Sequence, residues 1–272
     1  MTLRRTWWIK LRRAEKHLAE FKSEFSRLRD GAHPLRVSQE IMPGNGMDFL
    51  IVRGCLPPLT NDCDDIAAIV GDMIANTRSA LDHICVALTG SDRAQFPVFT
   101  DDIWQPDIDP AGKDRNKKRR EDFKNWTRGM PAVALDLIKK VQPYAATQQW
   151  PASNPLAVLN RISNADKHRT LMIMSQYIYN ERVFVSVPGY LDPSSAGINE
   201  PGRQRADGAI LGTLPVTWPA SITPLVAASG GIIIGLKEES SLSWDWDVPG
   251  SLDVLLEYIR TAVIDPLDAF AP

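Results

Sequence analysis

The stretch from about residue 62 to residue 88 constrains the fold of this chain more than any other. Apolar side chains recur there at steps of three or four residues, the period of one face of an α-helix. They are Ile66, Val70, Met73, Thr77, Leu81, Ile84 and Leu88. Gly90 follows, at the kind of position where helices commonly end. The pattern predicts a long central helix around which the other elements pack.

The residues before this helix predict a second helix and a hairpin. Residues 7–31 repeat apolar side chains at helical spacing. These are Trp8, Leu11, Leu18, Phe21, Phe25 and Leu28. Residues 35–54 form two runs around a Pro-Gly-Asn-Gly turn, the pattern of a β-hairpin. Residues 113–129 predict a basic helix or arm, and further helices are predicted from Pro131 to about Val141 and from residue 154 towards 168.

The composition of the chain changes near residue 171. Residues 171–189 predict a hairpin turning at Asn180-Glu181, and strands are predicted within 209–218, 230–240 and 242–248. Residues 249–270 predict a final helix with Ser251 as its cap. The predicted fold is α+β: a helical N-terminal half with a long central helix, and a β-rich C-terminal half closed by a C-terminal helix. The regions 1–170 and 171–272 are expected to form one continuous domain.

Composition narrows the class of protein. The 272 residues are 44% hydrophobic and 24% charged, with a net charge of −2 and a pI near 6.1. Such a balance does not fit a dedicated DNA-binding domain, which is usually basic throughout. The three cysteines form no C-x-x-C pair, which argues against a disulfide framework and a zinc site. With no signal peptide or membrane span expected, the chain is predicted to be cytoplasmic.

The central helix carries an unusual polar group, "ANTRSALDHIC". On a helical wheel, Asn76 and His83 flank the apolar stripe on one side, and Arg78 and Asp82 flank it on the other. Arg78 and Asp82 stand at the i,i+4 spacing of an ion pair. One interpretation is structural: a boundary ion pair and a hydrogen-bonded histidine. The other is catalytic, because a histidine exchanges protons near neutral pH and an arginine stabilises the charge that develops during phosphoryl transfer.

"RSALDH" has the form R-x-x-x-x-H and resembles the signature of HEPN domains. The resemblance implies a helical bundle that forms homodimers and cleaves RNA through its 2′-hydroxyl without a metal or other cofactor. Arg78 and His83 would be the catalytic pair, and Asn76 and Asp82 would support it. Family members commonly carry a larger polar residue where this chain has Ser79. The resemblance also implies a toxin or phage-defence role with an antitoxin or defence-system partner.

A broader resemblance covers most of the chain. The segments "KLRRAEKHLAEF", "GDMIANTRSALDHICVAL", "FPVF", "KKVQPY" and "NRISNADKHR" occur in this order. In these the chain resembles a group of bacterial proteins of the same layout that have no assigned activity. This resemblance implies a bacterial or phage-like origin and supplies no activity.

A second polar group lies in "NRISNADKHRT". Asp166 continues an apolar stripe, which predicts a partly buried carboxylate that needs a partner such as Arg78 or His83. Asp166 and His168 are therefore further catalytic candidates, with Asn164 and Lys167 as support. The structural alternative is a helix C-terminus, where cations favour the helix dipole. A metal site of Asp82, His83, Asp166 and His168 is a third interpretation, and no compact metal-binding motif supports it.

The run "KDRNKKRRED" supplies the strongest local positive charge. Its cations are Lys113, Arg115, Lys117, Lys118, Arg119 and Arg120. Such a run is either a solvated arm or a nucleic-acid contact surface. Trp104 and Trp126 flank it, either as core anchors or as platforms for bases. Three functions therefore stay open: a metal-independent endoribonuclease, a non-catalytic interaction or binding module with a structural Arg/Asp/His network, and a metal-dependent hydrolase.

Overall fold

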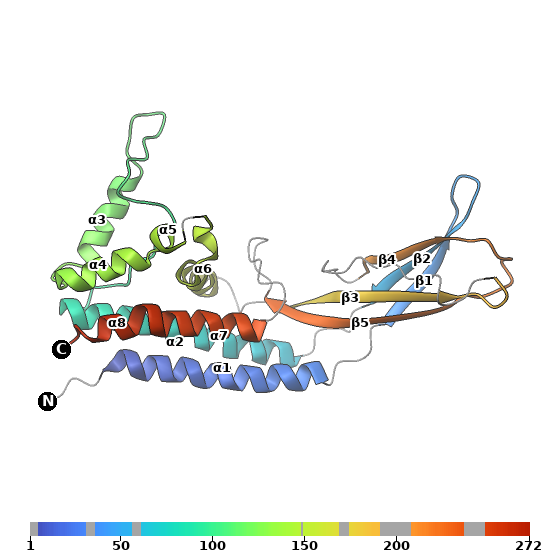
Figure 1. Ribbon diagram of the computed structural model, residues 1–272, viewed down its shortest axis with the longest axis horizontal. Coiled ribbons are helices and arrows are strands. Elements are labelled where there is room, and N and C mark those ends of the chain that lie inside the picture. Colours follow the sequence, from blue (N-terminus) through green and yellow to red (C-terminus); the bar gives the residue numbers. More distant parts are fainter. Residues whose placement is uncertain are drawn as a thin grey trace. The chain divides into compact units, whose positions relative to one another are not determined.

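The computed structural model describes residues 5–30, 36–55, 61–147, 149–168, 174–190, 208–236 and 248–272. Within these ranges, only the backbone is described for 28–30, 61–63, 166–168, 174–182 and 228–236. The chain divides into two compact units. The first unit combines residues 1–23, 65–172 and 238–272, and the second combines residues 24–64 and 173–237. The first is helical and the second contains the strands (Figure 1).

Two long helices and a C-terminal helical segment make up much of the helical unit (Figure 1). The elements assigned to it, wholly or in part, are α1 (Thr6–Asp30), α2 (Asn61–Thr89), α3 (Asn116–Trp126), α4 (Ala132–Val141), α5 (Pro143–Ala146), the 3-10 turn η1 (Pro151–Ser153), α6 (Pro155–His168), α7 (Val248–Tyr258), the π-helical turn η3 (Ile259–Ile264) and α8 (Asp265–Asp268). No helix in the described ranges is long and apolar enough to span a bilayer.

The predicted apolar stripe of α2 is confirmed. All seven of its side chains are buried, including the polar Thr77, whose Oγ1 donates to the carbonyl of Met73 over 2.8 Å. The prediction for α1 is wrong in one detail, because Trp7 is buried at 3% exposure while Trp8 is only half-buried. The indole N–H groups of both tryptophans donate to Asp268. This shared acceptor joins the start of α1 to α8.

The strand unit contains two antiparallel sheets. One has the order β1 (Arg36–Met42), β2 (Phe49–Cys55), β4 (Ile210–Pro215), and the other pairs β3 (Met174–Ser186) with β5 (Leu225–Leu236). At the end of β3, Val183 and Val185 are buried while Phe184 between them is exposed, as expected for a strand with one face on a core. The two sheets share one apolar cluster of Leu50, Val52, Val183, Val185, Val187, Leu211 and Trp218.

The α+β class is confirmed, but a β-rich C-terminal half is not supported. The strands come from both halves of the sequence, because the hairpin predicted over 35–54 and observed at 36–55 pairs with β4 through β2. The chain then ends in helices, and these belong to the helical unit with α2. Sequence alternation shows that a strand has a buried face but not which strand will pair with it.

Three local predictions were also wrong or lie outside the described residues. Asn180-Glu181 makes no hairpin turn, because β3 runs on through it and pairs with β5 on both sides, with a register irregularity between Tyr179 and Arg182. Ser251 does not cap the final helix, which already begins at Val248. Most of the strand predicted over 242–248 lies outside the described residues.

Candidate functional site

Arg78 and Asp82 hold an irregular stretch of backbone against α2. Nη2 of Arg78 donates to Oδ1 of Asp82 over 3.1 Å and to the carbonyl of Phe96 over 2.8 Å. The same Oδ1 accepts the backbone N–H of Phe96 over 2.9 Å. Both backbone polar groups of Phe96 are therefore satisfied by side chains one turn apart on α2. A non-helical segment needs such partners when it lies in the interior.

The guanidinium of Arg78 makes three contacts within the helical unit. Besides these two bonds, Nη1 lies 3.5 Å from Oδ1 of Asn160 on α6. The Arg78 side chain is only 12% exposed, and that of Asp82 is 31% exposed. The i,i+4 ion pair predicted from the sequence is present. It connects α2 to Phe96 and reaches towards α6.

Gln142 completes the support of this segment and was not singled out from the sequence. It is fully buried at the end of α4. Its Oε1 accepts the N–H of Phe99 over 3.0 Å, and its Nε2 donates to the carbonyls of Pro97 and Ile138. The stretch from Phe96 to Phe99 is thus fixed by polar side chains at both ends. No local sequence pattern marks a glutamine for this role.

His83 and Asn76 make separate contacts. Nδ1 of His83 lies 2.9 Å from Oγ1 of Thr6, at the start of α1. Nδ2 of Asn76 donates to the carbonyl of Asp72 in its own helix over 2.8 Å. The contacts of Arg78 and His83 have no partner in common among the described residues. The polar side chains of α2 therefore contact separate parts of the helical unit: the Phe96 segment and α6, the start of α1, and α2 itself.

The second predicted group lies mostly beyond what is described. The backbone of α6 continues through His168, but the side chains of Asp166, Lys167 and His168 are outside the described residues. Their predicted approach to Arg78 or His83 stays a prediction. Asn164 is exposed. The α6 side chain that does reach Arg78 is Asn160, one turn earlier.

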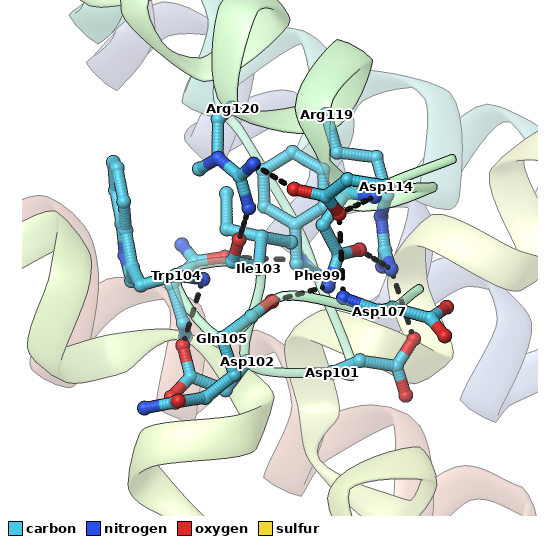
Figure 2. Close-up of polar contacts among 12 residues, drawn as sticks. Phe99, Asp101, Asp102, Ile103, Trp104, Gln105, Asp107, Asp114, Arg119 and Arg120 are labelled. Atoms are coloured by element: carbon cyan, nitrogen blue, oxygen red, sulfur yellow. Dashed lines mark hydrogen bonds and ion pairs between the residues drawn. The ribbon is translucent and has the colours of Figure 1, made fainter. Parts of the chain in front are cut away.

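A network around Asp114 organises the segment that leads into α3 (Figure 2). Asp114 forms an ion pair with Arg120, and the guanidinium of Arg120 also donates to the carbonyl of Ile103 over 2.9 Å. Oδ1 of Asp114 accepts the backbone N–H groups of Asn116 and Asp107. Asp114 therefore fixes the first turn of α3 onto the preceding loop. Hydrogen bonding from Arg120, followed by these N–H groups, lowers the pKa of the Asp114 carboxyl below its usual value.

Arg119 has an equally specific internal role. Its Nη1 donates to Asp101 over 3.2 Å and to the side-chain oxygen of Asn116 over 3.0 Å. Its guanidinium also lies 5.2 Å from the centre of the Phe99 ring. Arg119 and Arg120 were both predicted as nucleic-acid contacts. Here they hold the loop and α3 together (Figure 2).

The other four predicted cations are exposed: Lys113, Arg115, Lys117 and Lys118. None of these side chains makes an ion pair or hydrogen bond within the described parts of the chain. Lys113 closes a tight loop in which Oδ1 of Asp109 accepts the N–H groups of Ala111 and Lys113. We call these four residues the cationic surface. They lie on the hydrogen-bonded loop at 109–113 and on the start of α3.

A cleft beside the C-terminal end of α3 was not predicted. Its volume is about 490 Å³. It is lined by Ser91, Arg93, Asp122, Asn125, Trp126 and Arg128. Ser91 and Arg93 lie in the turn after α2, and the other lining residues belong to α3, except Arg128, which follows it. Two arginines, an indole and a carboxylate around one hollow are a chemically specific set.

Neither a metal-binding group nor a reactive Cys85 thiol is found among the described residues. Among them, no group of three or more His, Cys, Asp or Glu side chains is arranged to hold a metal ion. Two members of the metal set considered from the sequence, Asp166 and His168, are beyond this description. Cys85 is fully buried, and burial raises the pKa of its thiol far above the usual value. Such a thiol is unreactive at neutral pH.

Comparisons with protein-family models, with curated proteins and with solved structures found no match for this chain.

Replacing Asp82 by Ala is expected to reduce the free energy of unfolding by about 2 kcal/mol. The change leaves the guanidinium of Arg78 and the N–H of Phe96 without their shared acceptor. Urea unfolding followed by circular dichroism measures the loss. Asp92→Ala is the control, because Asp92 is exposed in the turn after α2 and its side chain makes no contact in the described structure. Its effect should stay within about 0.5 kcal/mol, and equal effects for both variants would contradict the role given to Asp82.

Replacing Arg120 by Met is expected to raise the pKa of Asp114 towards its usual value of 3.8. In the wild type the ionised carboxylate is favoured by folding. Its contribution to stability is therefore complete above the usual pKa and is lost as the pH falls through the lower pKa of the folded state. Carboxyl carbon NMR during an acid titration reads the pKa directly. Lys118→Met, which removes a nearby charge without a contact, should leave it almost unchanged. An unaltered pKa in Arg120→Met would disprove the assigned cause.

Proposed function

We propose that this chain is a binding module for RNA that uses the cationic surface, and that the Arg78–Asp82 pair serves the fold. The observation that carries the proposal is the division among the cations of residues 113–120. Arg119 and Arg120 form internal ion pairs, whereas Lys113, Arg115, Lys117 and Lys118 are exposed and form no ion pair with any residue that the structure describes. Unpaired cations grouped on a fixed support attract phosphates.

An exposed indole on the loop that is bonded to α3 favours a single strand as the ligand. Trp104 is 37% exposed and lies edge-on to Phe123, with ring centres 5.4 Å apart. Its N–H donates to the hydroxyl of Tyr144, and Nζ of Lys139 lies 5.7 Å from its ring centre. An indole held in this way offers a stacking surface to an unpaired base. The resemblance of "RSALDH" to HEPN domains adds RNA as the first ligand to test.

Replacing Lys117 and Lys118 by Gln is expected to weaken RNA binding and make it less dependent on salt. The slope of log affinity against log salt concentration should fall by about 0.7 for each lost phosphate contact. Fluorescence anisotropy with a labelled single-stranded RNA measures it. The matched control, Lys16→Gln with Lys140→Gln, removes two exposed lysines elsewhere in the helical unit. Equal slopes for the two double variants would overturn the proposal, as would a wild type that binds no RNA at low salt.

A metal-independent endoribonuclease is the second candidate, favoured by the environment of His83. The half-buried imidazole is oriented by its Nδ1 contact with Thr6, and its Nε2 makes no bond to a described residue. Such a nitrogen is available for proton exchange. In this proposal His83 moves the proton of the 2′-hydroxyl, and Arg78 assists in a homodimer with a toxin or phage-defence role. Because Arg78 is already bonded three ways, it would have to leave its contacts to reach a phosphate.

The endoribonuclease proposal predicts RNA cleavage in EDTA that leaves 2′,3′-cyclic phosphate ends. His83→Ala should abolish cleavage. His17→Ala is the matched control, since Arg12 and His17 have the same sequence spacing on α1. Folding of both variants is checked by circular dichroism. Cleavage that survives His83→Ala, or that both variants lose equally, counts against catalysis by His83.

A further inference from the structure

The cleft beside α3 has the size of a small-ligand site. Its volume of about 490 Å³ lies within the usual range for such sites. One wall is the turn that carries Ser91 and Arg93, and the other is the end of α3 with Arg128. All of these residues belong to the helical unit.

The walls of the cleft are held together by backbone contact. Gly129 has a φ of +88°, and a Cβ placed on it would lie 3.3 Å from the carbonyl oxygen of Thr89. The turn after α3 therefore approaches the last residue of α2 closely. On the opposite wall, Oγ of Ser91 accepts the N–H of Arg93, and the N–H of Ser91 donates to Oγ1 of Thr89. Both arginines thus rise from short, bonded turns.

The charge of the cleft suits one phosphate group. Its lining holds two guanidiniums and one carboxylate, a formal charge of +1. In the described structure neither Arg93 nor Arg128 forms an ion pair. Nη2 of Arg128 donates to the amide oxygen of Asn125 over 2.9 Å, which orients the guanidinium. Two such groups bind a phosphate through paired hydrogen bonds, whereas the carboxylate of Asp122 disfavours a triphosphate.

Trp126 supplies a fixed aromatic surface next to these charges. It lines the cleft and is stacked on Phe99, with ring centres 6.4 Å apart and planes 12° apart. Phe99 is itself fixed, because Gln142 accepts its N–H and Arg119 lies over its ring. The indole therefore needs no reordering to receive a flat ligand, which lowers the entropic cost of binding.

We propose that this cleft binds a nucleoside monophosphate, with Arg93 and Arg128 on the phosphate and the base against Trp126. Asp122 would accept hydrogen bonds from hydroxyl or amino groups of the ligand. The inference deepens the proposed RNA binding and rests on it where the ligand is the 5′-phosphorylated terminal nucleotide of a strand. A free nucleotide presents the same chemistry. The two sources are separated by experiment.

Isothermal titration of the full chain with GMP, AMP, ribose 5-phosphate and inorganic phosphate tests the site. GMP or AMP should bind at least tenfold more tightly than inorganic phosphate. Arg93→Gln with Arg128→Gln should weaken nucleotide binding at least tenfold. Arg12→Gln with Arg13→Gln, which removes two exposed arginines from α1, should not. Trp126→Phe should lower the preference for a nucleotide over ribose 5-phosphate while keeping an aromatic ring on Phe99.

Several results would overturn the inference. They are no nucleotide binding at about 1 mM, equal affinity for GMP and inorganic phosphate, and equal affinities for the cleft variant and the α1 control. Tighter binding of a 5′-phosphorylated RNA than of its 5′-hydroxyl form, lost in the cleft variant, assigns the strand terminus as the ligand. Equal binding of both RNAs together with GMP binding assigns the free nucleotide.

The proposal for the cleft and the proposal for the cationic surface can be disproved independently of each other. RNA affinity that responds to Lys117 and Lys118, without any nucleotide binding, overturns the cleft alone. Nucleotide binding without RNA binding supports the cleft and overturns only the RNA proposal.

Discussion

The bonding of the Phe96 backbone by Asp82 and Arg78 is the constraint on which the helical unit depends. The chain leaves α2 at Thr89 and forms no regular element until Asn116. Yet this stretch carries Phe96, Phe99 and Ile103 into the core, each less than 10% exposed. Buried irregular backbone is costly unless its polar groups are paired. Asp82, Arg78 and Gln142 supply these partners, and the segment then delivers Phe99 to Arg119 and Trp126 of α3.

The same pairing separates structural cations from available ones. Arg78, Arg119 and Arg120 each donate both to a carboxylate and to another described oxygen, a backbone carbonyl or a side-chain amide. Removing any of them leaves polar groups without partners. Within the described chain, neither the four residues of the cationic surface nor the two arginines of the cleft form an ion pair, although Arg128 donates to the amide oxygen of Asn125. Ligand binding is therefore proposed for the second set, whereas the contacts of Arg78 and Asp82 support the fold.

Local periodicity explains what the sequence predicted correctly. The stripe from Ile66 to Leu88 and the hairpin at 36–55 depend on neighbours a few residues away, and both are present. Trp7 is buried in place of Trp8 although both indoles donate to the same distant acceptor, Asp268, so helical spacing alone did not identify the buried one. Asn180-Glu181 resembles a turn locally, but pairing with β5 keeps β3 continuous through it. Such details of burial and strand continuity depend on contacts with distant residues, which local periodicity does not encode.

The candidate site was predicted only in part for the same reason. An i,i+4 ion pair can be read from one helix, so Arg78 and Asp82 were found together. The cleft unites the turn at 91–93 with α3, and the support of Phe99 comes from Gln142, 43 residues away. Neither contact corresponds to a regular residue spacing that could be recognised in the sequence. The run at 113–120 showed positive charge. It did not show which of its cations would form ion pairs with Asp101 and Asp114.

A double-mutant cycle of Arg78→Met and Asp82→Ala tests the central claim most directly. If the pair acts as one structural unit on Phe96, the double variant should be more stable than the sum of the single losses implies, by about 1–2 kcal/mol. Losses that add within about 0.5 kcal/mol, in variants that keep the wild-type fold, would contradict the account and return Arg78 to the list of residues available for chemistry.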